Sequence, residues 1–196
     1  MTMIEGRRER KRRETRTRIC DAAMSLFLQK GYVAVTVDEI AEAADISKRT
    51  FFGYFPAKED VVSAWQEKFN EPLLAAIAAG PEGETPFQAL ERAMLRTLAE
   101  SATPQAFAVD ALVRSTPGLA ARAAQKYVFL EERVSAVLHE RYPGHSLLSL
   151  RLLAMIVIGA LRIGAEEGRA NEMKPGDILP FSRNIFATLR EQLSKV

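Results

Sequence analysis

Apolar residues recur along most of the chain at intervals of three and four, which is the spacing of one face of an α-helix. The first run of this kind comprises Ile19, Ala22, Ala23, Leu26 and Phe27. Gly31 follows this run and favours a helix end there. Residues 32–37 alternate between apolar and polar positions and are rich in β-branched side chains, which would allow an isolated strand.

The residues after position 34 favour a helix start over that strand. Thr36 and Glu39 have the spacing of a capping box, and Val35 and Ile40 are placed as the hydrophobic staple across it. A short helix is therefore predicted to begin at about Val37.

A second short helix is predicted directly after the first. Ser47 is a good N-cap, and Ile46 and Phe51 occupy the staple positions around it. Only residues 44–46 separate the two helices, which is about the length of the turn in a helix-turn-helix. Pro56 then interrupts the pattern.

Beyond Pro56, helical patterns alternate with segments rich in Gly and Pro, of which residues 80–86 form the clearest loop. The expected helical segments are 58–69, 87–102, 107–113, 119–142, 147–167 and 181–193. The sequence contains no convincing pair of strands and no repeat. We therefore predict an all-α fold of about nine helices. A three-helix module lies over residues 16–60, with the helix-turn-helix at about 36–55, and a larger helical domain covers 61–196.

Positive charge is concentrated at the N-terminus. The 196-residue chain has a net charge of only +2, yet residues 1–18 contain eight Arg or Lys against three Glu. Residues 1–15 are predicted to form a basic, flexible arm. Two interpretations of this arm stay open, a solvated tail and a segment that contacts DNA phosphates.

Composition indicates a soluble, cytoplasmic protein. The hydrophobic content of 47% is enough for a core. Cys20 is the only cysteine, so an intrachain disulfide is excluded and a reducing compartment is expected. A lone cysteine in an apolar helix more often packs inertly than acts as a redox trigger. The longest apolar run, residues 152–161, has ten residues, whereas a membrane-spanning helix needs about 20.

No pattern of catalytic residues emerges from the sequence. His139 and His145 are the only histidines, and neither has a cysteine or carboxylate at a metal-binding spacing. A Gly-rich loop that could cradle phosphate is also missing from the sequence. We expect no metal, no cofactor and no enzymatic activity.

Residues 16–69 resemble the TetR family of bacterial transcriptional regulators. The resemblance rests on the T-x-x-x-I-A-x-x-A core that begins at Thr36, the S-K-x-T-x-x-x-Y-F segment that begins at Ser47, and the lysine at position 58. Beyond this first third, the resemblance extends only to length and helix number. It implies that the C-terminal domain binds a small-molecule effector and dimerises through its last two long helices, which pair with their copies in a four-helix bundle.

The resemblance also implies which residues contact DNA. Lys48 and Arg49 would face base edges, where Arg can bind guanine O6 and N7 with two hydrogen bonds. The full set of expected DNA-binding residues is Thr36, Ser47, Lys48, Arg49, Thr50, Phe52, Gly53, Tyr54 and Lys58. Thr36, Thr50, Tyr54 and Lys58 are expected on phosphates. Many relatives carry Gly at position 49, Tyr at 52 and a larger residue at 53, so these three positions depart from the family pattern.

Residues 152–161 are apolar on every face, which fits the homodimer that the resemblance implies, although a deep intrachain core would also explain it. The expected interface residues are Leu152, Ile156, Gly159, Ala160, Ile185, Phe186 and Leu189. A largely apolar effector pocket is expected to involve Trp65, Phe69, Met94, Leu98, Phe107, Tyr127, Met155 and Ile163. For each of these residues, plain core packing is the competing interpretation.

The leading hypothesis is a homodimeric repressor that binds a palindromic operator in duplex DNA and is released by a small, largely apolar ligand. Two alternatives remain. One is a DNA-coating protein without sequence preference, and the other is an all-α carrier or enzyme whose helix pair is only structural.

Overall fold

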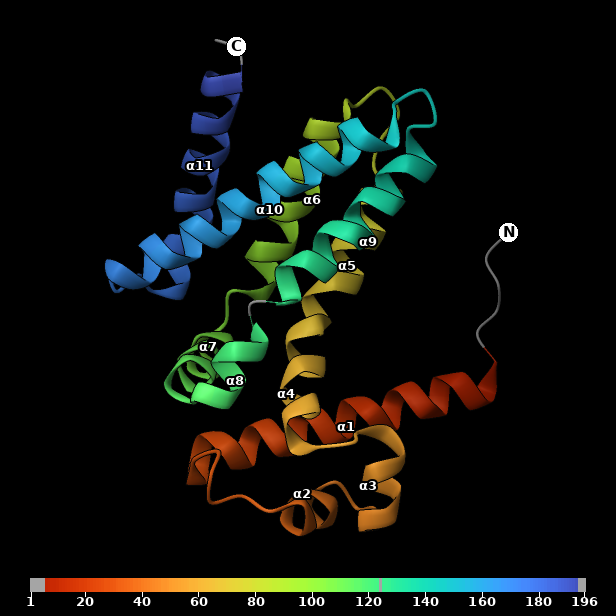
Figure 1. Cartoon of the computed structure of the whole chain (residues 1–196), viewed down its shortest axis with the longest axis vertical. Coiled ribbons are helices and arrows are strands. Elements are labelled where there is room, and N and C mark those ends of the chain that lie inside the picture. The colour runs from red at the N-terminus through yellow and green to blue at the C-terminus, as the bar shows by residue number, and fades with distance from the viewer. Residues whose placement is uncertain (1–5, 124, 194–196) are drawn as a thin grey trace. The chain divides into compact units, whose positions relative to one another are not determined.

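Helices form all the regular secondary structure in the part of the chain that the computed structural model describes, residues 6–123 and 125–193 (Figure 1). The α-helices are α1 (Arg7–Lys30), α2 (Val37–Ala43), α3 (Lys48–Tyr54), α4 (Lys58–Gln66), α5 (Asn70–Ala78), α6 (Pro86–Ser101), α7 (Pro104–Ser115), α8 (Pro117–Ala123), α9 (Gln125–Arg141), α10 (Leu147–Ala170) and α11 (Ile178–Leu193). Two 3₁₀ helices, η1 (Glu67–Phe69) and η2 (Pro175–Asp177), complete the set. The all-α prediction is confirmed.

The described residues contain eleven α-helices, where the sequence predicts about nine. One additional helix arises because the chain is helical again after η1, which gives α5 as well as α4. The other arises because the segment expected to be one helix over 119–142 forms two, α8 and α9. The strand considered for residues 32–37 is absent from the structure, since the capping box of Thr36 starts α2 at Val37.

The chain divides into two compact units, and it passes from one unit to the other three times. The first unit contains Met1–Glu67 and Ala108–Ala123, and the second contains Lys68–Phe107 and Ala124–Val196. The sequence predicts a single boundary near residue 60, whereas α4, the end of α7 and all of α8 belong to the first unit. The functional roles of the two parts stay predictions.

The core of the first unit is built around α1. Ile19, Ala23, Met24 and Phe27 present one face of this helix and are fully buried. They pack with apolar residues of α2, α3 and α4, and with Val109, Val113 and Leu119 from α7 and α8. Burying each large side chain contributes about 1.5–3 kcal/mol, so this cluster decides how the short helices are held. Cys20 lies in the same core, which fits its interpretation as a packing residue.

Helix α1 begins much earlier than the sequence predicts. Residues 7–15, expected to be part of a flexible arm, are helical and continuous with the rest of α1, which corrects that expectation. Residues 1–5 lie outside the described residues. Residues 7–15 are helical because Arg, Lys and Glu favour helices and because neither Gly nor Pro occurs between Arg7 and Lys30.

The second unit has its own core, formed by α5, α6, α9, α10 and α11 (Figure 1). Its fully buried members include Leu73, Ile77, Leu90, Met94 and Leu138. Helices α9 and α10 follow one another through a short turn and make the most extensive helix pair of the described chain. Gly164 lets α11 approach α10, because a Cβ at this position would collide with Ile185.

A partly buried charge network ties the loop between α5 and α6 to the end of α9. Glu84 accepts hydrogen bonds from Arg92 Nε at 2.7 Å and from Arg141 Nη2 at 3.2 Å. The hydrogen bonds from Arg92 are the main reason that the pKa of Glu84 is lowered. Arg92 also donates to the Ala76 carbonyl at 3.1 Å. Gly80 adjoins this network, and any Cβ there would displace both guanidinium groups.

Candidate nucleic-acid interface

The turn between α2 and α3 is fixed by backbone hydrogen bonds. The Ile46 amide donates to the Ala41 carbonyl at 3.0 Å, and the Asp45 amide donates to the Glu42 carbonyl at 3.0 Å. This pair of bonds is the Schellman motif that ends a helix with a left-handed residue. Asp45 supplies that residue, with φ of 51°, a conformation that Asp tolerates better than most residues. The turn is therefore tight and specified by its own sequence.

Caps and buried aromatic side chains define the orientation of α3. Ser47 accepts a hydrogen bond from the Thr50 amide at 3.1 Å, as the sequence predicts. Phe51 and Phe55 lie one turn apart with ring centroids 5.9 Å from each other, and both are buried in the core of the first unit. These two rings mark the buried side of the helix. The opposite side of α3 must consequently face outward.

The outward side of α3 carries the residues predicted to read bases. Lys48, Arg49 and Gly53 are exposed, and 47% of Phe52 is accessible to solvent. Lys48 Nζ donates to Asp38 of α2 at 2.8 Å, an exposed ion pair worth about 0–1 kcal/mol. Within the part of the chain that the structure describes, Arg49 has no hydrogen bond or ion pair. Its guanidinium is free to bind an external acceptor.

The predicted phosphate-binding hydroxyl groups are already used in helix capping. Thr36 Oγ1 donates to Glu39 Oε2 at 3.0 Å and accepts from the Glu39 amide at 3.2 Å. The hydroxyl groups of Ser47 and Thr50 are 2.8 Å apart. All three side chains are exposed, so each oxygen is still accessible from outside. Tyr54 is half-buried at the end of α3.

Lys58 differs from the other predicted contacts because its ammonium is held inside the first unit. Nζ donates to the carbonyls of Tyr32 and Val35, each at 3.0 Å, and lies 4.4 Å from the centroid of the Tyr32 ring. It therefore joins the start of α4 to the loop between α1 and α2. A phosphate contact by Lys58 stays a prediction.

Polar contacts around the start of α4 continue to α8. Tyr32 Oη donates to Glu59 Oε1 at 2.5 Å. Burial, followed by this bond to the carboxylate, raises the pKa of Tyr32, and the same bond lowers the pKa of Glu59. Asp60 caps α4 by accepting from the Ala57 amide at 2.8 Å, and it also accepts from Arg122 at 2.7 Å.

Asp38, Glu59 and Arg122 are not identifiable from local sequence patterns as part of this region. Asp38 and Lys48 are ten residues apart on different helices, and Asp60 and Arg122 are 62 residues apart. No local spacing rule relates residues at such separations. Only the charge complementarity across the predicted helix pair could have suggested the first contact.

The carboxylate of Glu39 stabilises the start of α2. The hydrogen bond from Lys30, at 2.7 Å, is the largest reason that the pKa of Glu39 falls from 4.5 to about 2. The bond from the Thr36 amide, at 2.8 Å, is the next cause. The ionised form of Glu39 is thus the form that the folded protein favours.

Of the residues predicted to line an effector pocket, Trp65 belongs to the first unit and the other seven belong to the second. Trp65 packs against the core of the first unit, whereas Phe69, Leu98 and Tyr127 surround the core of the second and Met94 is buried in it. Phe107 is half-buried in the second unit. Met155 and Ile163 are 49% and 53% exposed, and their part in an effector pocket stays a prediction. Their place on α10 faces solvent because Leu150, Ala154 and Val157 occupy its inner face.

The predicted interface residues separate into two groups. Phe186 is only 1% exposed and packs edge-on against Phe87 of the same chain, which corrects its assignment to a dimer interface. Ile185 and Leu189 are half-buried on the same helix. Leu152 is 47% exposed, and Ile156, Gly159 and Ala160 are half-buried. Phe186 is therefore the fully buried member of the set, and the other six are half-buried or exposed.

Comparison with known proteins identifies relatives of the helix-turn-helix and of the whole fold. Residues 19–65 match the model described as "Bacterial regulatory proteins, tetR family". The chain is 35% identical over 144 residues to the HTH-type transcriptional regulator TcmR of Streptomyces glaucescens, a match that covers 69% of this chain and 64% of TcmR. It is 38% identical over 79 residues to the HTH-type transcriptional repressor KstR of Mycobacterium tuberculosis, which covers 40% of this chain and 36% of KstR. The chain thus spans slightly less than two thirds of TcmR and about a third of KstR.

Solved structures share the all-α fold along most of the chain. A TetR-family transcriptional regulator from Streptomyces coelicolor superposes with a TM-score of 0.63 at 21% identity, covering 93% of this chain and 99% of that one. SmeT in its complex with triclosan superposes with a TM-score of 0.61 at 16% identity, covering 93% and 91%. At these identities, the likeness shows the fold.

Replacing Glu39 by Gln tests the electrostatic cap of α2. The pKa of Glu39 is lowered in the folded protein. Its charge therefore adds to the free energy of unfolding above pH 4.5, and this gain is lost as the pH falls toward 2. Gln keeps a capping oxygen but has no charge. Denaturant unfolding followed by circular dichroism should show that Glu39→Gln destabilises the protein at neutral pH and that the difference disappears near pH 2. Glu42→Gln, in an exposed position of the same helix, is the matched control. A constant difference between wild type and Glu39→Gln across this pH range would contradict the account.

Proposed function

The chain belongs to the TetR family of bacterial regulatory proteins, and on that premise we propose that it is a DNA-binding transcriptional regulator whose helix α3 reads bases in the major groove. The observation that carries this proposal is the outward side of α3, where Lys48 and Arg49 lie exposed opposite the buried Phe51 and Phe55. A helix with cationic residues at its N-terminal end fits the major groove of B-DNA, which is about 12 Å wide. Regulators of this kind act in the cytoplasm, and no enzymatic step is proposed.

Arg49 is the residue best suited to discriminate between base pairs. Its guanidinium has no partner among the described residues, so DNA binding would break no internal bond. Arg can donate two parallel hydrogen bonds to guanine O6 and N7, and this contact is worth about 1–3 kcal/mol of discrimination. Lys48 would have to exchange its bond with Asp38 for a base or phosphate, at a cost of about 0–1 kcal/mol.

Gly53 and Phe52 complete the reading surface. A Cβ at Gly53 would meet no atom of the described chain within 4 Å, so internal packing does not require glycine here. Glycine within a helix lowers the stability of the helix by about 1 kcal/mol relative to alanine. Close approach of the helix backbone to DNA gives a reason for this cost. The exposed ring of Phe52 is placed to contact a thymine methyl group.

Regulation by a small molecule would reach α3 through the segment 108–123. This segment joins the chain of the second unit on both sides, yet it folds as part of the first unit. Val113 and Leu119 are buried in the same cluster as Phe51, and Arg122 holds the N-terminal turn of α4 through Asp60. Ligand binding in the second unit would release DNA only if the ligand prefers an arrangement in which this segment, and with it α4, is displaced.

The ligand itself is proposed to be small and largely apolar. SmeT, which shares the fold, was solved in complex with triclosan, and KstR is named as a transcriptional repressor. The name of KstR supports repression, and the SmeT complex shows that a protein of this fold can hold a small molecule. The residues Phe69, Leu98 and Tyr127, half-buried around the core of the second unit, are the expected contacts that remain compatible with a pocket there.

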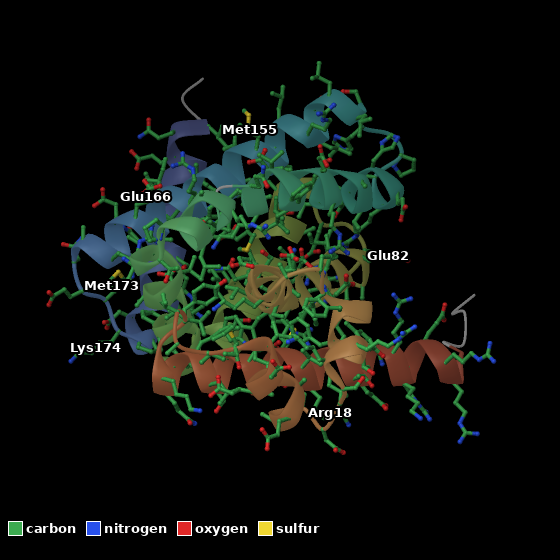
Figure 2. All side chains as sticks on the ribbon, turned by 60° about the horizontal axis from the view of Figure 1, so that its bottom comes forward. Arg18, Glu82, Met155, Glu166, Met173 and Lys174 are labelled. Carbon is green, nitrogen blue, oxygen red and sulfur yellow. The ribbon has the colours of Figure 1, made fainter. Side chains whose placement is uncertain are left out.

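The outer face of α10 is proposed to pair with a second copy of the chain. Leu148, Leu152, Met155, Gly159 and Ile163 recur at helical spacing along this face, and Figure 2 shows Met155 at the outer surface. A Cβ at Gly159 would meet nothing within 4 Å, which leaves room for a second helix to approach. By length and composition α10 is the one helix among the described residues that could cross a membrane. A twofold dimer explains this apolar face as well, and it presents two reading helices to half-sites about 34 Å apart.

Arg49→Ala tests sequence reading directly. Duplexes that wild type selects from a random pool should be bound by the variant about 5–150-fold more weakly, while affinity for unselected duplexes changes little. Fluorescence anisotropy on both kinds of duplex measures the ratio, and Arg183→Ala, an exposed cation of the second unit, is the control. Undiminished discrimination would contradict the assignment and favour a DNA-coating protein.

Energetic coupling between α3 and the segment 108–123 can be tested with DNA as the only ligand. If the two are energetically coupled, binding of a selected duplex should slow amide hydrogen exchange in residues 109–119, although these residues touch no DNA. Arg122→Ala should reduce this protection and leave exchange in α2 and α3 protected. Protection confined to α1, α2 and α3 in wild type would show that the proposed route carries no coupling.

Leu152→Glu tests the dimer. Burying a carboxylate in an apolar interface should raise the dimer dissociation constant by about 100-fold, or roughly 3 kcal/mol. Analytical ultracentrifugation measures the mass, and Val33→Glu, which changes an exposed apolar residue of the first unit, is the control. A wild-type protein that is monomeric, or that partitions into lipid vesicles, would overturn the proposed interface.

A further inference from the structure

The N-terminal half of α1 is the most strongly charged surface of the described chain, and base reading by α3 does not account for it. Residues 7–18 contain eight Arg or Lys and two Glu, an excess of six positive charges, and all ten side chains are exposed. Arg10 pairs with Glu14 at 3.7 Å, and Arg16 pairs with Glu67 at 3.7 Å. Lys11 and Arg12 have no hydrogen bond or ion pair among the described residues.

This charge pattern is unfavourable for an isolated helix. Arg8 and Arg12, and Arg12 and Arg16, are four residues apart, and like charges at this spacing destabilise a helix by a few tenths of a kcal/mol each. The helix is nevertheless continuous from Arg7 to the buried residues that begin at Ile19. A continuous helix with an excess of six positive charges is complementary to a row of anions at regular spacing.

The position of Arg16 shows how this row lies relative to the reading helix. Its guanidinium carbon lies 5.3 Å from the centroid of Phe55, the residue that ends α3. From Arg16 the helix continues for nine more residues to Arg7, which is about 14 Å at 1.5 Å per residue. In Figure 1 the N-terminal end of α1 runs past α3, and in Figure 2 nitrogen-tipped side chains surround that end.

These dimensions match the geometry of duplex DNA. The major groove is about 12 Å wide, so a helix that extends about 14 Å beyond the end of α3 can reach past the edge of the groove that α3 occupies. Phosphates border the groove on each side, with one negative charge per about 1.7 Å of helix axis. Since residues 7–18, called the α1 arm, belong to the same compact unit as α3, DNA bound to α3 would present its flanking backbone to this arm.

We propose that Arg7–Arg18 forms a second DNA-binding element, which contacts phosphates outside the base pairs read by α3. It contributes affinity that depends on salt but not on sequence, and it lengthens the DNA that each subunit covers. This inference rests on the proposed function, because it requires α3 in the groove. Acidic protein partners and anionic membranes are the other surfaces that such a helix could meet.

The test uses an arm variant that combines Lys11→Gln and Arg12→Gln in one protein. Its binding to two duplexes is compared with that of wild type. One duplex contains only the sequence selected by wild type, and the other adds about one helical turn, roughly 10 base pairs, on each side. Gln favours helices about as well as Lys and Arg, so α1 should stay helical, which circular dichroism checks. Lys174→Gln with Arg183→Gln, which removes two exposed cations of the second unit, is the matched control.

Wild type should bind the longer duplex more tightly, and the arm variant should lose that gain. The slope of log affinity against log salt concentration should fall by about two, since each phosphate contact contributes roughly 0.9. The control variant should behave as wild type. Sequence discrimination should be unchanged in the arm variant, in contrast to Arg49→Ala.

Two results would overturn the inference. Equal salt slopes and equal gain from the longer duplex in wild type and arm variant would show that the arm contacts no phosphate. A loss of sequence discrimination in the arm variant would show that the arm reads bases. Failure of the proposed function has a different signature, because wild type would then select no sequence from the random pool.

Discussion

Burial of Phe51 and Phe55 in the core of the first unit is the interaction on which the proposed function depends. These two rings occupy one side of a seven-residue helix, which is too short to be stable alone in water. Their packing in one cluster with residues of α1, α2 and α4 holds the helix in place and fixes its rotation about its own axis. Because the rotation is fixed, Lys48 and Arg49 point outward by necessity. Core packing therefore positions the cations without any contact to their charged groups.

The residues that frame α3 serve two purposes at once. Thr36, Ser47 and Thr50 are exposed hydroxyl residues, and each already satisfies a backbone or side-chain group at a helix start. A hydroxyl group has only one proton to donate, so Thr36, which already donates to Glu39, would have to turn its proton toward a phosphate. In the Ser47–Thr50 pair only one hydroxyl donates to the other, so the second keeps its proton for a phosphate. Lys58 is less available to a phosphate, since its ammonium already donates to two carbonyls and lies over an aromatic ring. The loop before α2 and the start of α4 are thus held together beside the reading helix, which links stability and recognition in one small region.

Local sequence rules predicted the helix-turn-helix well because its determinants are local. Both N-caps and the all-α fold were predictable from spacings of three and four residues and are confirmed. The helical state of residues 7–15 was missed because a run of charges suggests a solvated tail, although each residue favours a helix. The inclusion of residues 108–123 in the first unit, and the burial of Phe186 against Phe87, depend on packing between distant segments. No periodicity within a single helix distinguishes a face buried in its own core from a face that meets a second chain.

The most direct test of sequence reading by α3 is methylation interference at guanine N7, an atom that faces the major groove. Duplexes selected by wild type would be methylated at random and separated into bound and free fractions. The account predicts that methylation of one guanine in each half-site prevents binding by wild type, and that the same methylation has little effect on Arg49→Ala. If methylation at every guanine N7 left wild-type binding unchanged, α3 would not read the major groove as described.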